Sequence, residues 1–211
     1  MNASTARLAL DVLDLPPGGT VAVTGAAGAA GGYAVEPARA DGLTMIADAA
    51  PRDVETVRGF GADHVVERGA GIAERIRALV PEGVAGVVDG SAQTADPVPA
   101  ISDGGTLVEL RGWPGPAERD IRVCPVMVPD RIGDTAGPDT LCRQAEAGVL
   151  TPRVAQVLPA AVRGDEGQQI APRGATGTRR DEVRVRPLTQ PSGNVTAFPP
   201  DHCRDAARRK L

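Results

Sequence analysis

Residues 21–32 read VAVTGAAGAAGG, a run of small and β-branched residues followed by a loop of glycine and alanine. The spacing in the loop is Ala26-x-Gly28-x-x-Gly31, which departs from a strict GxGxxG because Ala26 stands at the first glycine position. The run before the loop predicts a strand buried on both faces, and the residues after it predict a helix. A glycine loop between a strand and a helix lets a pyrophosphate approach backbone N–H groups at the helix N-terminus. The stretch therefore predicts a dinucleotide-binding loop.

The alternation of strand and helix continues on both sides of this loop. Strands are predicted at Thr20–Thr24, Thr44–Ala47, His64–Val66, Gly86–Asp89, Thr106–Leu110 and Ile121–Val126. Helices are predicted at Thr5–Leu15, with Ser4 as its N-cap, and at Gly28–Ala40, Asp53–Phe60, Ile72–Val80 and Ala95–Ile101. Such alternation is typical of βαβ units with right-handed crossovers. We expect an α/β fold with a doubly wound parallel sheet of the Rossmann type.

The chain divides into two parts by composition. Residues 1–160 carry the ordered alternation and are predicted to form one dinucleotide-binding domain. Residues 161–211 are rich in Arg, Gly, Asp and Pro and have few apolar anchors. Such a segment buries too little apolar area to offset the entropy of ordering it. We expect this tail to be irregular and disordered.

Composition excludes several classes of partner. The net charge is −4, with 23 basic and 27 acidic residues, which does not favour nucleic acid. No apolar run approaches the roughly 20 residues that cross a bilayer, and the N-terminus lacks the features of a signal peptide. We expect a cytoplasmic protein without a membrane partner.

The sequence offers no metal site. Its cysteines and histidines are Cys124, Cys142, Cys203, His64 and His202, and none of them form a CxxC pair or a helical ligand pair. This spacing does not fit a structural zinc site.

Two charged residues bear on the choice of cofactor. Asp48 lies at the end of the second predicted strand, about 20 residues after the loop, a spacing that suits an acid holding ribose hydroxyls and favours NAD. Arg52 is close by and suits a 2′-phosphate, which favours NADP. For each residue the alternative is a solvated surface charge. The sequence leaves the choice open.

Several short segments carry a family resemblance. They are Leu15-Pro16-Pro17-Gly18, the run Val23–Gly28, Gly61–Val66, Val87–Gly90, Leu110–Trp113 and Gly148–Pro152. Their order and intervals make residues 5–160 resemble the cofactor domain of the medium-chain dehydrogenase/reductases. Within that superfamily they are most similar to the zinc-independent NADPH:quinone oxidoreductase branch.

The resemblance implies an NAD(P)-dependent oxidoreductase that transfers hydride from NADPH, or from NADH, to a quinone or an enone-type small molecule. The cofactor supplies the hydride and the protein binds and orients it. The pyrophosphate would lie on the backbone of Ala27, Gly28, Ala29, Ala30 and Gly31. Residues after the fourth and fifth strands would lie near the nicotinamide or the middle of the cofactor; they are Gly90, Ser91, Arg111 and Gly112. The resemblance also implies a homodimer formed through the sheet edge at residues 121–126.

No residue is assigned a catalytic role. His64 is expected to be structural, because a general acid must be positioned near the substrate. Trp113 is expected to pack at the end of the fifth strand.

The sequence also departs from the family. The family has an N-terminal catalytic domain before its cofactor domain and an apolar strand at its end, whereas the ordered pattern here stops near Val162. A frame shift near Val162 is one hypothesis for the unusual tail. Pro37, inside the helix after the glycine loop, is expected to kink or end that helix. The alternative function is a truncated, catalytically inactive nucleotide-binding module or a degenerate fragment.

Overall fold

The computed structural model describes residues 2–91, 93–110, 112, 113, 115, 118–126 and 136–153. Two of the predictions fall outside the described residues: the role of Arg111 and the disorder of the tail at residues 161–211. The domain boundary at residue 160 therefore stays a prediction.

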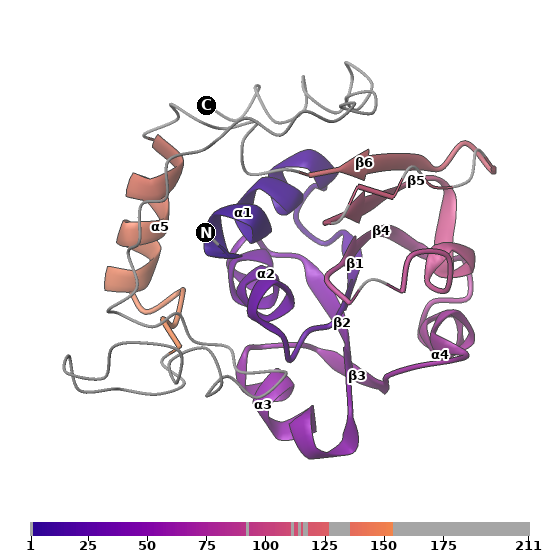
Figure 1. Ribbon diagram of the computed structural model, residues 1–211, viewed down its shortest axis with the longest axis horizontal. Helices are drawn as coiled ribbons and strands as arrows, with labels where there is room; N and C mark the ends of the chain where they lie inside the picture. The colour runs from indigo at the N-terminus through magenta and orange to yellow at the C-terminus, as the bar shows by residue number, and fades with distance from the viewer. Residues whose placement is uncertain are drawn as a thin grey trace, which may run out of the picture.

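The described residues form a six-stranded parallel sheet in the order β3-β2-β1-β4-β5-β6 (Figure 1). The strands are β1 (Thr20–Thr24), β2 (Thr44–Ala49), β3 (His64–Glu67), β4 (Val84–Asp89), β5 (Ile101–Glu109) and β6 (Arg122–Pro125). The chain builds outward from β1 to β3, then returns to place β4 on the other side of β1. This order confirms the predicted doubly wound sheet, and it places the topological switch point between β1 and β4.

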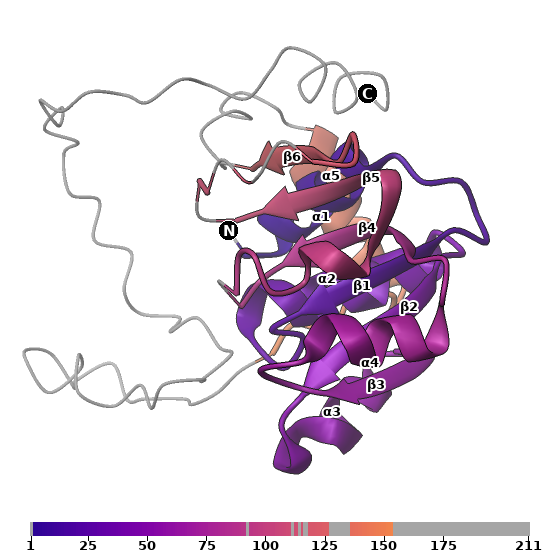
Figure 2. The ribbon, with the colours of Figure 1, turned by 90° about the vertical axis from the view of Figure 1, so that its right-hand side faces the viewer.

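Helices cover both faces of the sheet. They are α1 (Asn2–Leu13), α2 (Ala29–Ala40), α3 (Val54–Gly59), α4 (Ile72–Leu79) and α5 (Ala136–Glu146), with short 3-10 turns η1 (Pro51–Asp53) and η2 (Val98–Ala100). Helices α1, α2 and α3 pack on one face, and α4 with η2 packs on the other (Figure 2). Helix α5 lies outside α1 and contacts it (Figure 1).

The core is built from small aliphatic residues on both faces. Val21 and Val23 of β1 are buried against the α1–α2 side, whereas Ala22 between them is buried on the α4 side. Successive side chains of a strand point to opposite faces, so a central parallel strand with both faces covered must be apolar throughout. This burial explains why β1 lacks the polar alternation of a half-exposed strand.

The N-terminal helix begins earlier than predicted. Helix α1 starts at Asn2, so Ser4 lies inside the first turn and the prediction that it caps the helix is wrong. The helix is anchored instead by its buried face, which includes Ala6, Leu10 and Leu13. Tertiary burial outweighed the local capping signal here.

Two regions around prolines test the predicted helices. The helix predicted at Ala95–Ile101 is only the 3-10 turn η2, because Pro97 and Pro99 remove the backbone donors that a longer helix needs. By contrast, α2 continues through Pro37, which is buried, and ends three residues later at Ala40. The Asp41 N–H donates to the carbonyl of Pro37 and completes the last turn.

Candidate functional site

The glycine loop joins β1 to α2 at the carboxyl edge of the sheet. Gly25 leaves the strand with φ +68, and the Gly28 N–H donates to the Gly25 carbonyl over 2.8 Å to close the turn. The first hydrogen bond of the helix runs from the Gly32 N–H to the Gly28 carbonyl over 3.1 Å. The N–H groups of residues 29–31 precede that bond and have no partner within the helix. A helix N-terminus with such N–H groups suits a phosphate.

Close backbone packing fixes the loop. A Cβ atom on Gly31 would overlap the carbonyl oxygen of Gly25. A Cβ atom on Gly25 would lie 2.8 Å from the carbonyl carbon of Gly90 and 2.9 Å from the Ser91 nitrogen, in the loop after β4. The glycines therefore let α2, β1 and the β4 loop approach one another at the switch point. The absent side chains leave backbone as the surface that meets a ligand, and this cradle fits a dinucleotide pyrophosphate.

Asp48, near the end of β2, contacts the start of the glycine loop. Its Oδ1 accepts hydrogen bonds from the N–H groups of Gly25, at 2.6 Å, and Ala26, at 3.2 Å. Burial raises the pKa of Asp48 above its ordinary value, and the hydrogen bonds offset this only in part. The residue is 2% exposed, so the alternative of a solvated surface charge does not apply to it. The structure places Asp48 as a support for the glycine loop.

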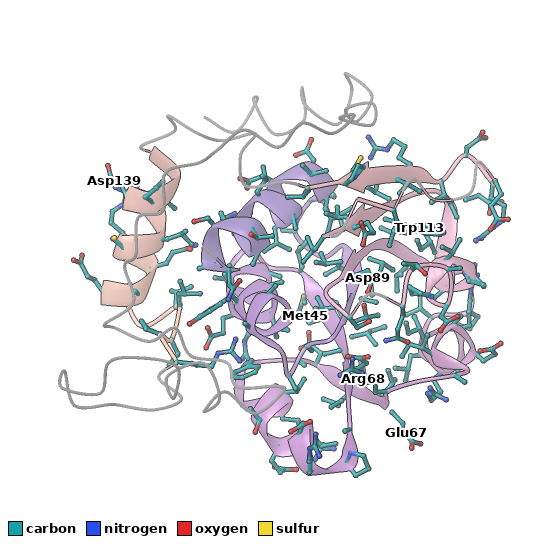
Figure 3. All side chains as sticks on the ribbon, viewed as in Figure 1. Met45, Glu67, Arg68, Asp89, Trp113 and Asp139 are labelled. Atoms are coloured by element: carbon teal, nitrogen blue, oxygen red, sulfur yellow. The ribbon has the colours of Figure 1, made fainter. Side chains whose placement is uncertain are left out.

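Two arginines lie near the ends of β2 and β3. The Arg52 side chain is 85% exposed, and its Nε lies 3.6 Å from Asp53 Oδ2. Arg68, directly after β3, has its Nε 4.0 Å from Asp48 Oδ2, and its side chain is 48% exposed (labelled in Figure 3). Sequence reasoning missed Arg68, although its place after the third predicted strand puts it at the carboxyl edge of the sheet.

Asp89 at the end of β4 organises the loop that follows (Figure 3). Its Oδ1 accepts from the Thr24 hydroxyl at 2.6 Å and from the N–H and hydroxyl of Ser91, both at 3.0 Å. Its Oδ2 accepts from the Thr94 N–H at 2.8 Å. Burial alone would raise the pKa of Asp89, but these hydrogen bonds outweigh it, so the pKa lies below its ordinary value. The network ties the β4 loop to the end of β1.

Gln93 joins the two carboxylate centres. Its Nε2 donates to Asp48 Oδ2 at 3.1 Å and to the Ser91 Oγ at 2.8 Å. The Asp48 oxygen can only accept, so the amide nitrogen must face it, and the Gln93 Oε1 points elsewhere. That oxygen is buried and makes no hydrogen bond with the described residues. The sequence carries no pattern that marks Gln93.

The remaining predicted cofactor-binding residues lie at the same edge of the sheet, except one that is not among the described residues. Gly90 and Ser91 join the loops described above, whereas Arg111 is not among the described residues. Gly112 is exposed after β5 with φ +88. The Trp113 side chain is partly buried against the core, which confirms its packing role. The Trp113 backbone N–H donates to Glu109 Oε2 over 2.7 Å.

His64 is exposed at the first residue of β3. Within the described part of the chain, no three His, Cys, Asp or Glu side chains lie together in a way that would hold a metal ion. None of the helices in that part is long and apolar enough to cross a bilayer.

Comparison with known proteins gives matches in structure only. No protein-family model matches the chain, and no curated protein sequence matches it. A 2-haloacrylate reductase superposes with a TM-score of 0.67 and 23% identity over 75% of this chain and 56% of its own. A mycobacterial protein complexed with NADPH superposes with a TM-score of 0.66 and 22% identity, over 74% of this chain and 54% of its own. A quinone oxidoreductase of Pseudomonas syringae superposes with a TM-score of 0.62 and 20% identity, over 74% of this chain and 53% of its own.

This chain spans about half the length of the solved structures it matches. At these identities the likeness shows the fold. The chain therefore shares the fold of about half of each of these three solved structures, two of which are named as a reductase and an oxidoreductase.

Proposed function

We propose that the chain is the cofactor-binding part of an NAD(P)-dependent oxidoreductase of the medium-chain dehydrogenase/reductase superfamily. The observation that supports this most strongly is the glycine cradle at the switch point. There the first turn of α2 presents N–H groups, and close backbone contacts at Gly25, Gly31 and Gly90 bring α2, β1 and the β4 loop together. Two matched structures named as a 2-haloacrylate reductase and a quinone oxidoreductase, and a third that holds NADPH, support the same proposal.

In this proposal the pyrophosphate lies on the backbone of residues 27–31, at the positive end of α2. The adenosine end lies toward β2 and β3, where Arg68, beside Asp48, and Arg52, beside Asp53, would meet a 2′-phosphate. The nicotinamide end lies toward the loops after β4 and β5, which include Gly90, Ser91, Arg111 and Gly112. The nicotinamide supplies the hydride when it is bound.

The proposed substrate is a small molecule with a quinone or an enone-type double bond. The support is the family resemblance of the sequence together with the matches to a quinone oxidoreductase and a 2-haloacrylate reductase. We also propose a homodimer through β6, which among the described residues is an end strand of the sheet with a neighbouring strand on one side only.

A second candidate is a nucleotide-binding module without turnover. It needs only the glycine cradle where α2, β1 and the β4 loop meet. The two candidates share the cofactor site and differ in the chemical step.

The test is steady-state oxidation of NADPH by the purified full chain, offered a panel of quinones and enones and followed by the loss of NADPH absorbance. Turnover with one class of acceptor supports the oxidoreductase. NADPH binding with no turnover across the panel supports the second candidate. Failure of the folded chain to bind either dinucleotide contradicts both.

A further inference from the structure

Arg153, the last described residue, packs against the first turns of the glycine helix. Its guanidinium lies between the rings of Tyr33 and Phe60, with its central carbon 4.6 Å from each ring centre. Its backbone N–H donates to the Tyr33 hydroxyl over 3.1 Å. Cation–π contacts with two aromatic faces hold a guanidinium in a defined place.

The same guanidinium binds the backbone of the glycine loop. The Arg153 Nη2 lies 3.2 Å from the carbonyl oxygen of Gly28 and 3.2 Å from that of Ala29, and donates to both. The neighbouring Thr151 N–H donates to Glu36 Oε2 over 3.0 Å. The segment that follows α5 is therefore attached to α2 at its first turns, although more than 100 residues separate them in sequence.

Gly32 provides the space for this contact. A Cβ atom on Gly32 would lie 2.6 Å from both Nη1 and Nη2 of Arg153. The dinucleotide motif gives no reason for this glycine, since Gly28 and Gly31 already fill its positions. A glycine inside a helix costs about 1 kcal/mol relative to alanine. The Arg153 guanidinium occupies the space that a side chain at residue 32 would need, which accounts for the glycine at this position.

The two carbonyls belong to functionally important peptide units. The Gly28 carbonyl shares a planar unit with the Ala29 N–H, and the Ala29 carbonyl shares one with the Ala30 N–H. In a trans peptide the carbonyl and the N–H point in opposite directions, so a donor on the carbonyl fixes where the N–H points. A charged donor on the carbonyl also polarises the unit and strengthens its N–H as a donor.

We propose that Arg153 is a positioning residue for the pyrophosphate, which orients and polarises the N–H groups of Ala29 and Ala30 through their peptide units. This inference rests on the proposed function. It adds a cation that acts on the phosphate through the backbone of α2.

The test compares two ligands by titration calorimetry on the full chain. NADPH carries the pyrophosphate, whereas adenosine 2′-monophosphate lacks it. Arg153→Ala is expected to weaken NADPH binding about tenfold and to leave the affinity for adenosine 2′-monophosphate unchanged. Arg153→Lys is expected to recover part of the loss, because an ammonium still makes cation–π contacts. Arg143→Ala, which removes an exposed charge from α5, is the matched control and is expected to bind both ligands normally.

A second pair of variants tests the geometry. Gly32→Ala is expected to weaken NADPH binding in the wild-type background and to add no further loss in the Arg153→Ala background, where the space is vacant. Additive losses would overturn the proposed contact. Equal losses for the two ligands, in step with a lower melting temperature, would overturn the positioning role and leave only support of the fold.

Failure of this inference can be told from failure of the proposed function. Normal NADPH binding by Arg153→Ala overturns the inference alone. Absence of binding of both NADPH and NADH by the folded wild-type chain overturns both.

Discussion

The carboxylate of Asp48 accepts a hydrogen bond of 2.6 Å from the backbone N–H of Gly25, the residue at which β1 becomes the glycine loop. Gly25 has a positive φ and close neighbours, so its N–H needs an acceptor inside the protein. Asp48 in β2 thereby supports the start of the loop. In the proposed function the N–H groups of the next turn bind the ligand, so support of the loop and binding of the ligand are assigned to different groups.

Replacing Asp48 separates hydrogen bonding from charge. Asp48→Ala leaves the N–H groups of Gly25 and Ala26 without their acceptor, and is expected to lower the free energy of unfolding by about 1–3 kcal/mol. Asp48→Asn keeps an oxygen for these donors, so its loss at pH 7 is expected to be smaller. Chemical denaturation of the variants measures both values. Equal stability of Asp48→Ala and the wild type would contradict the supporting role.

The same residue predicts a dependence on pH. Because burial raises the pKa of Asp48 above 3.8, the folded chain binds this proton more tightly than the unfolded chain does. The contribution of Asp48 to stability is therefore greatest below pH 3.8 and declines as the pH rises through the folded pKa. Asp48→Asn is expected to remove that decline when unfolding free energy is measured against pH.

Asp89 predicts the opposite trend. Its hydrogen bonds lower its pKa below 3.8, so its contribution is present above pH 3.8 and is lost as the pH falls through the folded pKa. Thr24→Val removes one donor at nearly constant shape and is expected to raise the pKa of Asp89 and to cost about 1 kcal/mol of stability. Carboxyl chemical shifts recorded against pH give the pKa. An unchanged value would show that the Thr24 hydroxyl does not stabilise the ionised form.

Gly31 tests the cradle directly. The added methyl group of Gly31→Ala would overlap the Gly25 carbonyl, so backbone must move at the phosphate site. The affinity for NADPH is expected to fall about tenfold or more. Gly59→Ala in α3 is the matched control, because its Cβ would meet nothing within 4 Å. Its affinity is expected to stay unchanged, and its stability to rise by about 1 kcal/mol. Similar affinities for the two variants would place the phosphate elsewhere.

Arg68 and Arg52 test the choice of cofactor. Arg68 is partly shielded beside Asp48, whereas Arg52 is almost fully exposed, so a phosphate contact with Arg68 is less screened by water. Arg68→Gln is expected to weaken NADPH binding about tenfold and to leave NADH binding nearly unchanged. Arg52→Gln is expected to have a smaller effect. Competition of each dinucleotide against a fluorescent analogue gives the ratios, and a larger effect of Arg52→Gln would reverse the assignment.

The positions of the strands along the chain and of the glycine loop could be predicted because both depend on local patterns. The sequences of β1 and β2 are rich in apolar and β-branched residues. The glycines between β1 and α2 have the spacing expected where two backbone segments pack closely. Strand β5 begins at Ile101, earlier than predicted. The early start was missed because Ser102, Asp103 and the glycines after them are not typical strand residues. Val84 of β4 pairs with Ile101 and Gly86 pairs with Thr106, with a register shift between them, so residues 102–105 form an irregular stretch of β5. Helix α5 was not predicted.

The arrangement of the site could be predicted only in part. The sequence marked Asp48 as a site residue because it lies at the end of the second predicted strand, but its hydrogen-bond partners come from loops far away in sequence. Gln93 lies 45 positions from Asp48, and Arg153 lies 125 positions from Gly28. Such contacts depend on tertiary packing, and no spacing in the sequence announces them.

The measurement that tests the central claim most directly is calorimetric titration of the folded full chain with NADPH and with NADH. The account predicts saturable binding of one or both at a single site, and its loss in Gly31→Ala but not in Gly59→Ala. A folded chain that binds neither dinucleotide, or a Gly31→Ala variant that binds as the wild type does, would contradict the claim that the glycine cradle is a dinucleotide site.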